Sequence, residues 1–461
     1  MAPRRIIIDT DPVRFDDILA ILLAFSAPSE KLQVLLISVT YGNTDLPNCL
    51  RNVLLLFHHV QNEIAWRERA GWSLGFETLR NSKPVVALGP EQPLAENVLM
   101  ADFLQRRDDL DESDLSQSLL TPAETWQEIL KVAEQSSTPE QVEIAKELKN
   151  AASLFTQSQT PAHLEILKFL RDNEPNSITI VAIGPMTNLA LAAAEDPETF
   201  LKVKEIVVMG GNIGQHDEPS FQSPFHSVQI PNIQEPPFRL IQQPPGHLRD
   251  MLNIRNQTAP VADFNTFADP VAAARVYALT SPKPHTTMPS TLPLPLHQAR
   301  GVSALPLLSP YPDNLPKRLN VTLFTMDITG KHMLTRGDFE ASLEPLLIAK
   351  SPLAEWVSAF MKASFDTIES QSPGAVKDAV EVQLHDLLTI WYCIDHDDTQ
   401  CQISKGEDLR VETVGQRSWK RKDDCDDEGL AGANGNRINR CVGTPGQDMF
   451  GRLLCKQVFG S

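Results

Sequence analysis

The sequence predicts an α/β fold: an open, mainly parallel, doubly wound sheet of the Rossmann-like kind, with helices on both faces. Three observations predict it. Short runs of β-branched residues alternate with longer helical patterns through the first 393 residues. Most of these runs are apolar at every position, as strands buried on both faces of a parallel sheet must be. A hydrophobic fraction of 42% supplies enough apolar side chains for a sizeable core.

The predicted strands are short and end at polar or glycine-containing segments. They are Arg5–Asp9, Gln33–Val39, Val85–Leu88, Ile178–Ile183, Glu205–Met209 and Val321–Thr325. Helical patterns follow several of them. Asp17–Phe25 is apolar after an acidic start, and Thr187–Ala194 opens with two residue types that favour the N-cap. Asp269 and Pro270 supply an N-cap and a first-turn proline for a helix over Val271–Leu279.

Two segments interrupt this alternation. Residues 214–255 are rich in Pro, Gln and His and show neither the strand nor the helix period, and residues 281–317 are Pro-rich. We therefore expect an α/β domain over residues 1–393 with irregular insertions at about 214–255 and 281–317, followed by a polar extension over 394–461 that packs on or beside it. For 214–255 two interpretations stay open: a genuine surface loop, or translated non-coding sequence.

Composition narrows the class of protein. A net charge of −18 argues against a nucleic acid or an anionic membrane as the main partner. No apolar run reaches membrane-spanning length, and no secretory apolar region precedes Asp9. None of the six cysteines forms a Cys-x-x-Cys pair or a zinc-type cluster. We expect a cytoplasmic protein with reduced thiols, although a local disulfide among the C-terminal cysteines stays open.

Carboxylates gather at the end of the first predicted strand. Asp9 and Asp11 alternate there, and Asp16 and Asp17 open the following helix. Ligands of open α/β sheets bind outside the carboxyl ends of the strands. Clustered carboxylates repel one another unless a positive charge lies between them, and a hard cation such as calcium prefers oxygen ligands. The alternative is that Asp16 only caps the helix and Asp11 is a solvated turn residue.

Other polar motifs also follow predicted strands or begin helices. They are Tyr41-Gly42-Asn43, Ile183-Gly184-Pro185-Met186-Thr187-Asn188, Met209-Gly210-Gly211-Asn212, Asp263-Phe264-Asn265 and His385-Asp386. Together they offer amides and carboxylates suited to a polyhydroxylated ligand and a metal ion.

With these motifs in combination, the chain resembles the inosine–uridine-preferring nucleoside hydrolase family, specifically its fungal members with a long C-terminal part. The resemblance runs with gaps from about Arg5 to Tyr392. It implies hydrolysis of the N-glycosidic bond of a ribonucleoside to free base and ribose. The implied calcium ligands are Asp11, Asp17, Asp386 and the main-chain carbonyl of Ile183. The implied substrate-binding residues are Asp16, Asn43, Asn256, Asp263, Asn265 and Met209.

The resemblance also implies a mechanism. Calcium would bind the 2′ and 3′ hydroxyls and one water, and Asp11 would act as general base on that water. His385 would protonate the departing base, although a histidine near a helix start is also commonly a structural core residue. The expected partner is a small nucleoside, with no nucleic acid and no membrane, and the expected assembly is a homodimer or homotetramer.

This sequence departs from the family pattern in several places. The family has glycine after the proline and two residues before the acid pair, whereas Val13-Arg14-Phe15 makes three without glycine. Gln105–Leu110 stands where a His-Gly…Gly-Leu loop is common. Asp263 replaces a glutamate, and Asn256 is one residue out of step. These departures keep open a catalytically impaired protein that binds a nucleoside without turnover.

A third interpretation is a haloacid-dehalogenase-like phosphatase. Asp9-Thr10-Asp11-Pro12-Val13 fits the opening motif of that class. The class also needs a later acidic pair, and Gly337-Asp338 lacks the second acid at the right spacing. Such an enzyme would use magnesium and release phosphate, so one assay separates the two enzymes.

Overall fold

The computed structural model describes residues 2–13, 15–94, 126, 153–211, 263–288, 310–312, 314–371, 376–395, 401–411, 419–421, 435–446 and 449–460. The strands are β1 Arg4–Thr10, β2 Leu32–Val39, β3 Val85–Leu88, β4 Thr156–Gln157, β5 Ile178–Ala182, β6 Glu205–Met209, β7 Val321–Phe324, β8 Met333–Thr335, β9 Glu381–Gln383, β10 Gln402–Glu407, β11 Leu409–Val411, β12 Trp419–Arg421 and β13 Ile438–Gly443. The helices are α1 Asp16–Ser26, α2 Leu46–Ala70, α3 Glu77–Ser82, α6 Ala162–Arg171, α7 Thr187–Glu195, α8 Pro197–Phe200, α10 Phe264–Ala268, α11 Pro270–Ala278, α13 Met326–Thr329, α14 Arg336–Ile348, α15 Pro352–Gln371, α16 Leu387–Ile394 and α18 Met449–Leu454. Shorter helical turns are η3 Pro284–Thr286, η4 Lys377–Ala379 and η6 Cys455–Phe459.

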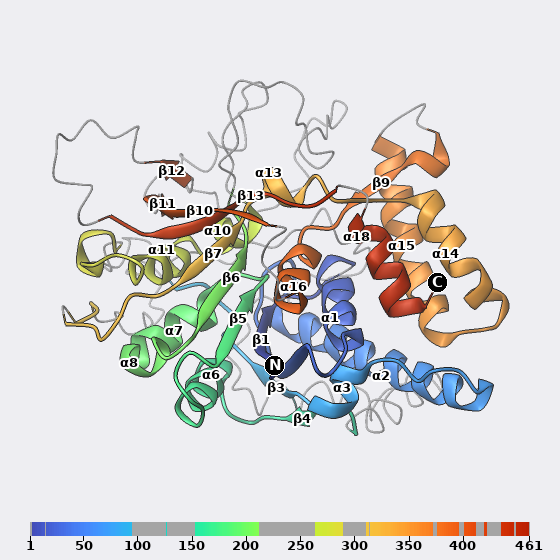
Figure 1. Cartoon of the computed structure of the whole chain (residues 1–461), viewed down its shortest axis with the longest axis horizontal. Helices are drawn as coiled ribbons and strands as arrows, with labels where there is room; N and C mark the ends of the chain where they lie inside the picture. Colours follow the sequence, from blue (N-terminus) through green and yellow to red (C-terminus); the bar gives the residue numbers. More distant parts are fainter. Residues whose placement is uncertain are drawn as a thin grey trace, which may run out of the picture.

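The main sheet has nine strands in the order β10-β13-β7-β6-β5-β1-β2-β3-β4 among the described residues (Figure 1). Every neighbouring pair in it is parallel except β10 and β13. The first strand, β1, lies in the interior of this sheet, because it pairs with β2 on one side and with β5 on the other. From there the chain runs outward in both directions, which confirms the predicted doubly wound, mainly parallel sheet.

Apolar side chains project from both faces of the sheet. On β1, Ile6 and Ile8 belong to one buried cluster with α1, α2, α15 and α16, whereas Ile7 belongs to a second cluster with α6, α7 and α11. This alternation follows from the period of two in a strand. Helices therefore cover both faces, and the continuous apolar runs in the sequence have this cause.

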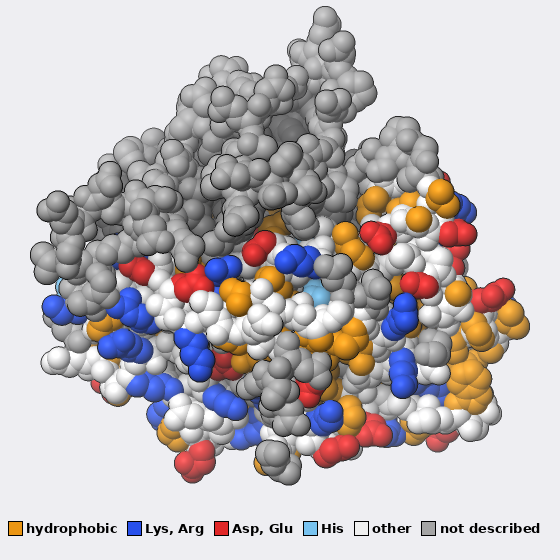
Figure 2. Space-filling model, turned by 45° about the horizontal axis from the view of Figure 1, so that its top comes forward, with side chains coloured by type: hydrophobic (Ala, Val, Ile, Leu, Met, Phe, Trp, Pro, Cys, Tyr) orange, Lys and Arg blue, Asp and Glu red, His pale blue; other side chains and the backbone are white. Residues whose placement is uncertain are grey.

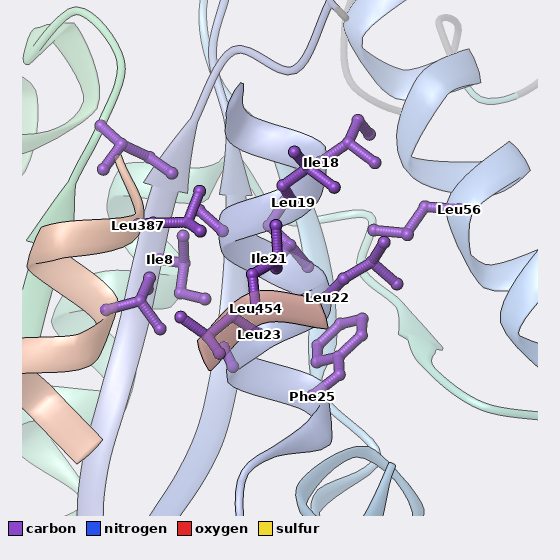
Figure 3. Close-up of a cluster of buried hydrophobic side chains, with 14 of the residues drawn as sticks. Ile8, Ile18, Leu19, Ile21, Leu22, Leu23, Phe25, Leu56, Leu387 and Leu454 are labelled. Atoms are coloured by element: carbon purple, nitrogen blue, oxygen red, sulfur yellow. The ribbon is translucent and has the colours of Figure 1, made fainter. Parts of the chain in front are cut away.

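Helix α1 packs at the centre of the first cluster (Figure 3). Its side chains Ile18, Leu19 and Leu22 are buried among residues that include Leu56 of α2 and Leu387 of α16. The helix begins at Asp16 although three residues separate it from Pro12, and Phe15 occupies the N-cap without a side-chain cap bond. The additional residue has therefore not moved the start of the helix away from the acid pair.

The chain after residue 394 contributes to the main sheet. Strand β13 pairs in parallel with β7, β10 pairs with β13, and Leu454 of α18 is buried in the first cluster. The polar composition of residues 394–461 indicated only packing on or beside the domain. The described cysteines, which are Cys49, Cys393, Cys401, Cys441 and Cys455, are all buried, and no disulfide joins any two of them.

The expected insertion at 214–255 lies outside the described residues, as do most of 281–317 and the segment Gln105–Leu110. None of the described helices is long and apolar enough to cross a membrane. On the face in Figure 2, basic side chains in the described part lie interspersed with acidic ones.

Candidate active site

The switch in strand order places β1 beside β5, and their carboxyl ends carry Asp11 and Ile183. In a doubly wound sheet, a crevice forms at this point because the connections leave toward opposite faces. The second strand, β2, ends beside them at Tyr41-Gly42-Asn43. Three of the sequence motifs therefore meet at one edge of the sheet.

Asp11 is fully buried at this edge. Its Oδ2 accepts a hydrogen bond of 2.6 Å from the backbone N–H of Asn43, while its Oδ1 has no hydrogen-bond partner. A Cβ at Gly42 would lie 2.0 Å from Oδ2, and one at Gly184 would lie 2.8 Å from Oδ1. Glycine at both positions is therefore required for the loops after β2 and β5 to enclose this carboxylate.

Asp17 turns back toward the end of β1. Its Oδ1 accepts 2.6 Å from the Thr10 hydroxyl and 3.3 Å from the Asp11 backbone N–H. Its place in the first turn of α1 fixes this direction. The added residue in Val13-Arg14-Phe15 has not removed Asp17 from the motif.

Asp16 connects the first motif to the last. Its Oδ2 accepts from the His385 backbone N–H at 3.2 Å, and its Oδ1 accepts from the Asp386 backbone N–H at 3.3 Å. Asp386 is the N-cap residue of α16, without a side-chain cap bond. Asp16 thus holds the start of α16 against α1. The two hydrogen bonds join Asp16 to residues that lie 369 and 370 positions later in the sequence.

The acids at this edge share an unfavourable electrostatic environment. Burial and the charge of Asp17 raise the pKa of Asp11 and of Asp16 well above the usual range. Burial and the charges of Asp16, Asp17 and Asp11 do the same for the pKa of Asp386. Burial raises the pKa of Asp17 to about 6, against the hydrogen bond from Thr10. Each carboxylate would be stabilised by a positive charge among them.

The donor types therefore fit a hard divalent cation. The buried Asp11 Oδ1 lacks a partner, and Asp17 and Asp386 repel it electrostatically. Within the described ranges, however, no three His, Cys, Asp or Glu side chains converge closely enough to form a complete metal cluster. The predicted ligands Asp11, Asp17 and Asp386 are among the residues this covers, so their three carboxylates do not form such a cluster in this structure. The fourth predicted ligand is the backbone carbonyl of Ile183.

The predicted substrate-binding residues differ in what their side chains contact. Asn265 on α10 lies beside the site, with its Nδ2 donating 3.0 Å to the Ile183 carbonyl and lying 3.9 Å from Met209 Sδ. Asp263 instead uses both oxygens internally: Oδ2 accepts from Gly211 N–H at 2.5 Å, and Oδ1 accepts from Thr266 N–H at 3.0 Å. Asn256 lies outside the described residues.

His385 is half-buried at the start of α16, beside Asp386. Its Nδ1 lies 2.7 Å from Thr329 Oγ1 and its Nε2 lies 3.2 Å from Gln383 Oε1. Burial, with a smaller effect of His332, lowers the pKa of His385 to about 4. The sequence interpretation relied on the ordinary pKa of histidine, and the structure places it well below that value.

Several residues at this edge were not among the predicted ligands or catalytic residues. Asp9 is fully buried and accepts from Ser38 Oγ at 2.5 Å and Asn188 Nδ2 at 2.9 Å. Burial raises the pKa of Asp9 to about 7 despite these bonds. Thr329 and Gln383 belong to no recognisable motif. Only the Asp-Thr-Asp spacing pointed to Asp9 and Thr10 as neighbours of the site.

Relatives among curated proteins match about half of the chain. Probable uridine nucleosidase 1 of Oryza sativa subsp. japonica is 32% identical over 208 residues, which cover 45% of this chain and 46% of that protein. The pyrimidine-specific ribonucleoside hydrolase RihA of Klebsiella pneumoniae is 30% identical over 210 residues, covering 45% and 49%. The chain thus spans about half the length of the curated relatives it matches.

Solved structures match over nearly the whole chain. An inosine-guanosine nucleoside hydrolase has a TM-score of 0.54 at 18% identity, covering 99% of both chains. The inosine-uridine preferring nucleoside hydrolase from Bacillus anthracis has a TM-score of 0.52 at 15% identity, also covering 99% of both. At these identities the likeness concerns the fold. The family described as inosine-uridine preferring nucleoside hydrolase matches residues 6–436, so the chain belongs to that family.

Proposed function

We propose that this chain hydrolyses the N-glycosidic bond of ribonucleosides to free base and ribose. The observation that carries the proposal is Asp11, a buried carboxylate with one unpaired oxygen at the switch point of the sheet in a member of this family. The names of the relatives support the same reaction, since they describe a uridine nucleosidase and a ribonucleoside hydrolase.

Asp11 has the contacts that a general base needs. The Asn43 N–H fixes Oδ2 at 2.6 Å, so Oδ1 is the oxygen left to accept a proton from water. The glycines at 42 and 184 enclose the carboxylate and limit its movement. A base held in this way loses little freedom when the substrate binds, which favours reaction from the bound geometry.

We propose calcium as the cofactor. Asp11, Asp17, Asp386 and the Ile183 carbonyl would hold it, because they offer oxygen donors of the kind it prefers. When bound, calcium would offset the repulsion among the carboxylates, contact the ribose hydroxyls and lower the pKa of a water. Asn265 donates one hydrogen bond to the Ile183 carbonyl, which has a second lone pair. That hydrogen bond would orient the carbonyl.

The remaining side chains would bind and release the sugar and base. Asn265 lies against the Ile183 carbonyl and Met209, and both side chains would contact the ribose. Asn43, whose N–H holds Asp11 Oδ2, would contact it as well. Asp16 and Asp263 would contribute mainly by holding the backbone, because their oxygens already accept backbone hydrogen bonds. His385 would contact the leaving base.

The products test this proposal directly. Inosine, uridine and adenosine are incubated with the full chain and calcium in ¹⁸O-labelled water, and the sugar is analysed by mass spectrometry. Hydrolysis predicts free base and ribose carrying one ¹⁸O atom. Nucleoside binding without product would support the impaired alternative, and phosphate release from a phosphomonoester would support the phosphatase. Asp11→Asn should release no base. Asp172→Asn, at an exposed acid after α6, is its control and should remain active.

A further inference from the structure

The ring of His385 is held on both sides by side chains from different parts of the chain. Thr329, at the end of α13, places its hydroxyl 2.7 Å from Nδ1, and Gln383, at the end of β9, places its Oε1 3.2 Å from Nε2. Thr329 is fully buried and Gln383 is 4% exposed. Neither side chain has another role in the proposed reaction, so the contact itself requires an explanation.

The orientation of the Gln383 amide assigns the hydrogen on the ring. Its Nε2 donates to the Gly330 carbonyl at 3.4 Å, which turns Oε1 toward His385. A carbonyl oxygen only accepts, so the His385 Nε2 must carry a hydrogen and donate it. In the neutral ring Nδ1 then lacks a hydrogen and accepts one from the Thr329 hydroxyl. The two neighbours together select the tautomer with hydrogen on Nε2.

The backbone reinforces this arrangement. The Leu384 N–H donates 2.9 Å to the His332 carbonyl, so the segment after α13 holds the main chain next to His385 as well as its ring. Helix α13 follows β7 directly, which places this segment at the carboxyl edge of the sheet with the other motifs. The position of His385 therefore depends on residues 329–332 as well as on α16.

We propose that Thr329 and Gln383 are positioning residues for nucleoside cleavage: they fix the His385 tautomer with hydrogen on Nε2, so that this N–H can donate to the leaving base when the base takes the place of Gln383 Oε1. This inference rests on the proposed function. The bond to Gln383 is at the long end of the usual range and the bond to Thr329 at the short end. An acceptor atom of the base would therefore replace Gln383, while Thr329 continues to hold Nδ1. A group that orients a histidine in this way fixes both its tautomer and its direction.

Kinetics with two leaving groups test the role of Thr329. Thr329→Val removes the hydroxyl with little change in volume and should lower kcat for inosine or uridine about two- to tenfold, the effect of one hydrogen bond. Nitrophenyl riboside, whose leaving group needs little help, should be hydrolysed at the wild-type rate. Thr329→Ser should restore kcat for the nucleosides. Equal losses on both substrates, or no rescue by serine, would overturn the proposal.

A matched control separates this effect from a loss of stability. Thr78 is also fully buried, and its hydroxyl donates to the Ala27 and Leu32 carbonyls at 2.8 and 3.0 Å, at the start of β2. Thr78→Val should lower the unfolding midpoint without changing the ratio of the two kcat values. A changed ratio in this control would remove the support from the kinetic result.

Nitrogen-15 NMR of histidine-labelled full-length chain tests the tautomer without any substrate. The wild-type His385 signals should show hydrogen on Nε2 and none on Nδ1, and Gln383→Leu should populate the other tautomer. A wild-type ring with hydrogen on Nδ1 alone would overturn the assignment. If the chain releases base from no nucleoside, the proposed function fails, and the NMR result still decides whether Thr329 and Gln383 orient His385.

Discussion

Replacing Asp263 by alanine should destabilise the protein by about 3 kcal/mol. Two terms contribute. Loss of the N-cap bond to Thr266 N–H costs about 1 kcal/mol, and leaving the buried Gly211 N–H without an acceptor costs about 2 kcal/mol more. Gly211 has φ 86°, so the turn after β6 already depends on glycine and on this acceptor. The same change should raise KM for nucleosides, because Met209 and Asn265 flank the turn.

Urea denaturation followed by circular dichroism measures this effect, with two variants for comparison. Asp196 caps α8 through one bond of 3.0 Å to Thr199 N–H and forms an exposed ion pair with Arg171 at 3.3 Å, which adds little, so Asp196→Ala should cost about 1 kcal/mol. Asp263→Asn keeps one acceptor oxygen, so its free energy of unfolding should lie between those of wild type and Asp263→Ala. A loss below about 0.5 kcal/mol for Asp263→Ala would refute the reasoning, because a buried amide would then have lost its acceptor at almost no cost.

Three further predictions use the same assays. His385→Ala should slow hydrolysis of inosine by roughly 10²–10⁴ and affect nitrophenyl riboside much less; equal losses would indicate a structural role. Gly42→Ala should abolish activity, because its Cβ would lie 2.0 Å from the Asp11 carboxylate, and a fully active variant would contradict the described enclosure. Asp9→Asn tests a dependence on pH. The pKa of Asp9 in the folded protein is about 7, above the usual 3.8. In the metal-free chain, protonated Asp9 therefore contributes to stability at low pH, and this contribution is lost as pH rises through 7. The variant should therefore be more stable than wild type at pH 8 and lose this advantage toward pH 4, as unfolding midpoints would show.

The strands and helices could be predicted because their signals are local. Apolar runs such as Ile178–Ile183 and the Asp269-Pro270 start reflect burial on two faces and helix capping, and both are visible in a few consecutive residues. The contribution of residues after 394 could not be predicted, because β13 pairs with β7 more than 100 positions earlier. Polar composition at a sheet edge does not reveal that pairing.

The candidate site divides in the same way. The motifs around Asp11, Asp17 and His385-Asp386 were found because each follows a strand or begins a helix, and the structure brings them to one edge. The internal use of Asp16 and Asp263 could not be foreseen, because it depends on which backbone amides lie within reach. The hydrogen bonds of Thr329 and Gln383 to His385 depend on a similar long-range approach.

Calcium-dependent base release measures the central claim most directly. The full chain is stripped of metal with a chelator, calcium is added back in steps, and free base released from inosine, uridine and adenosine is quantified for wild type and Asp11→Asn. We predict that release by wild type rises with calcium and that Asp11→Asn stays inactive while retaining the wild-type circular dichroism spectrum. Release that does not depend on calcium, or an active Asp11→Asn, would contradict the assignment of this carboxylate site to nucleoside hydrolysis.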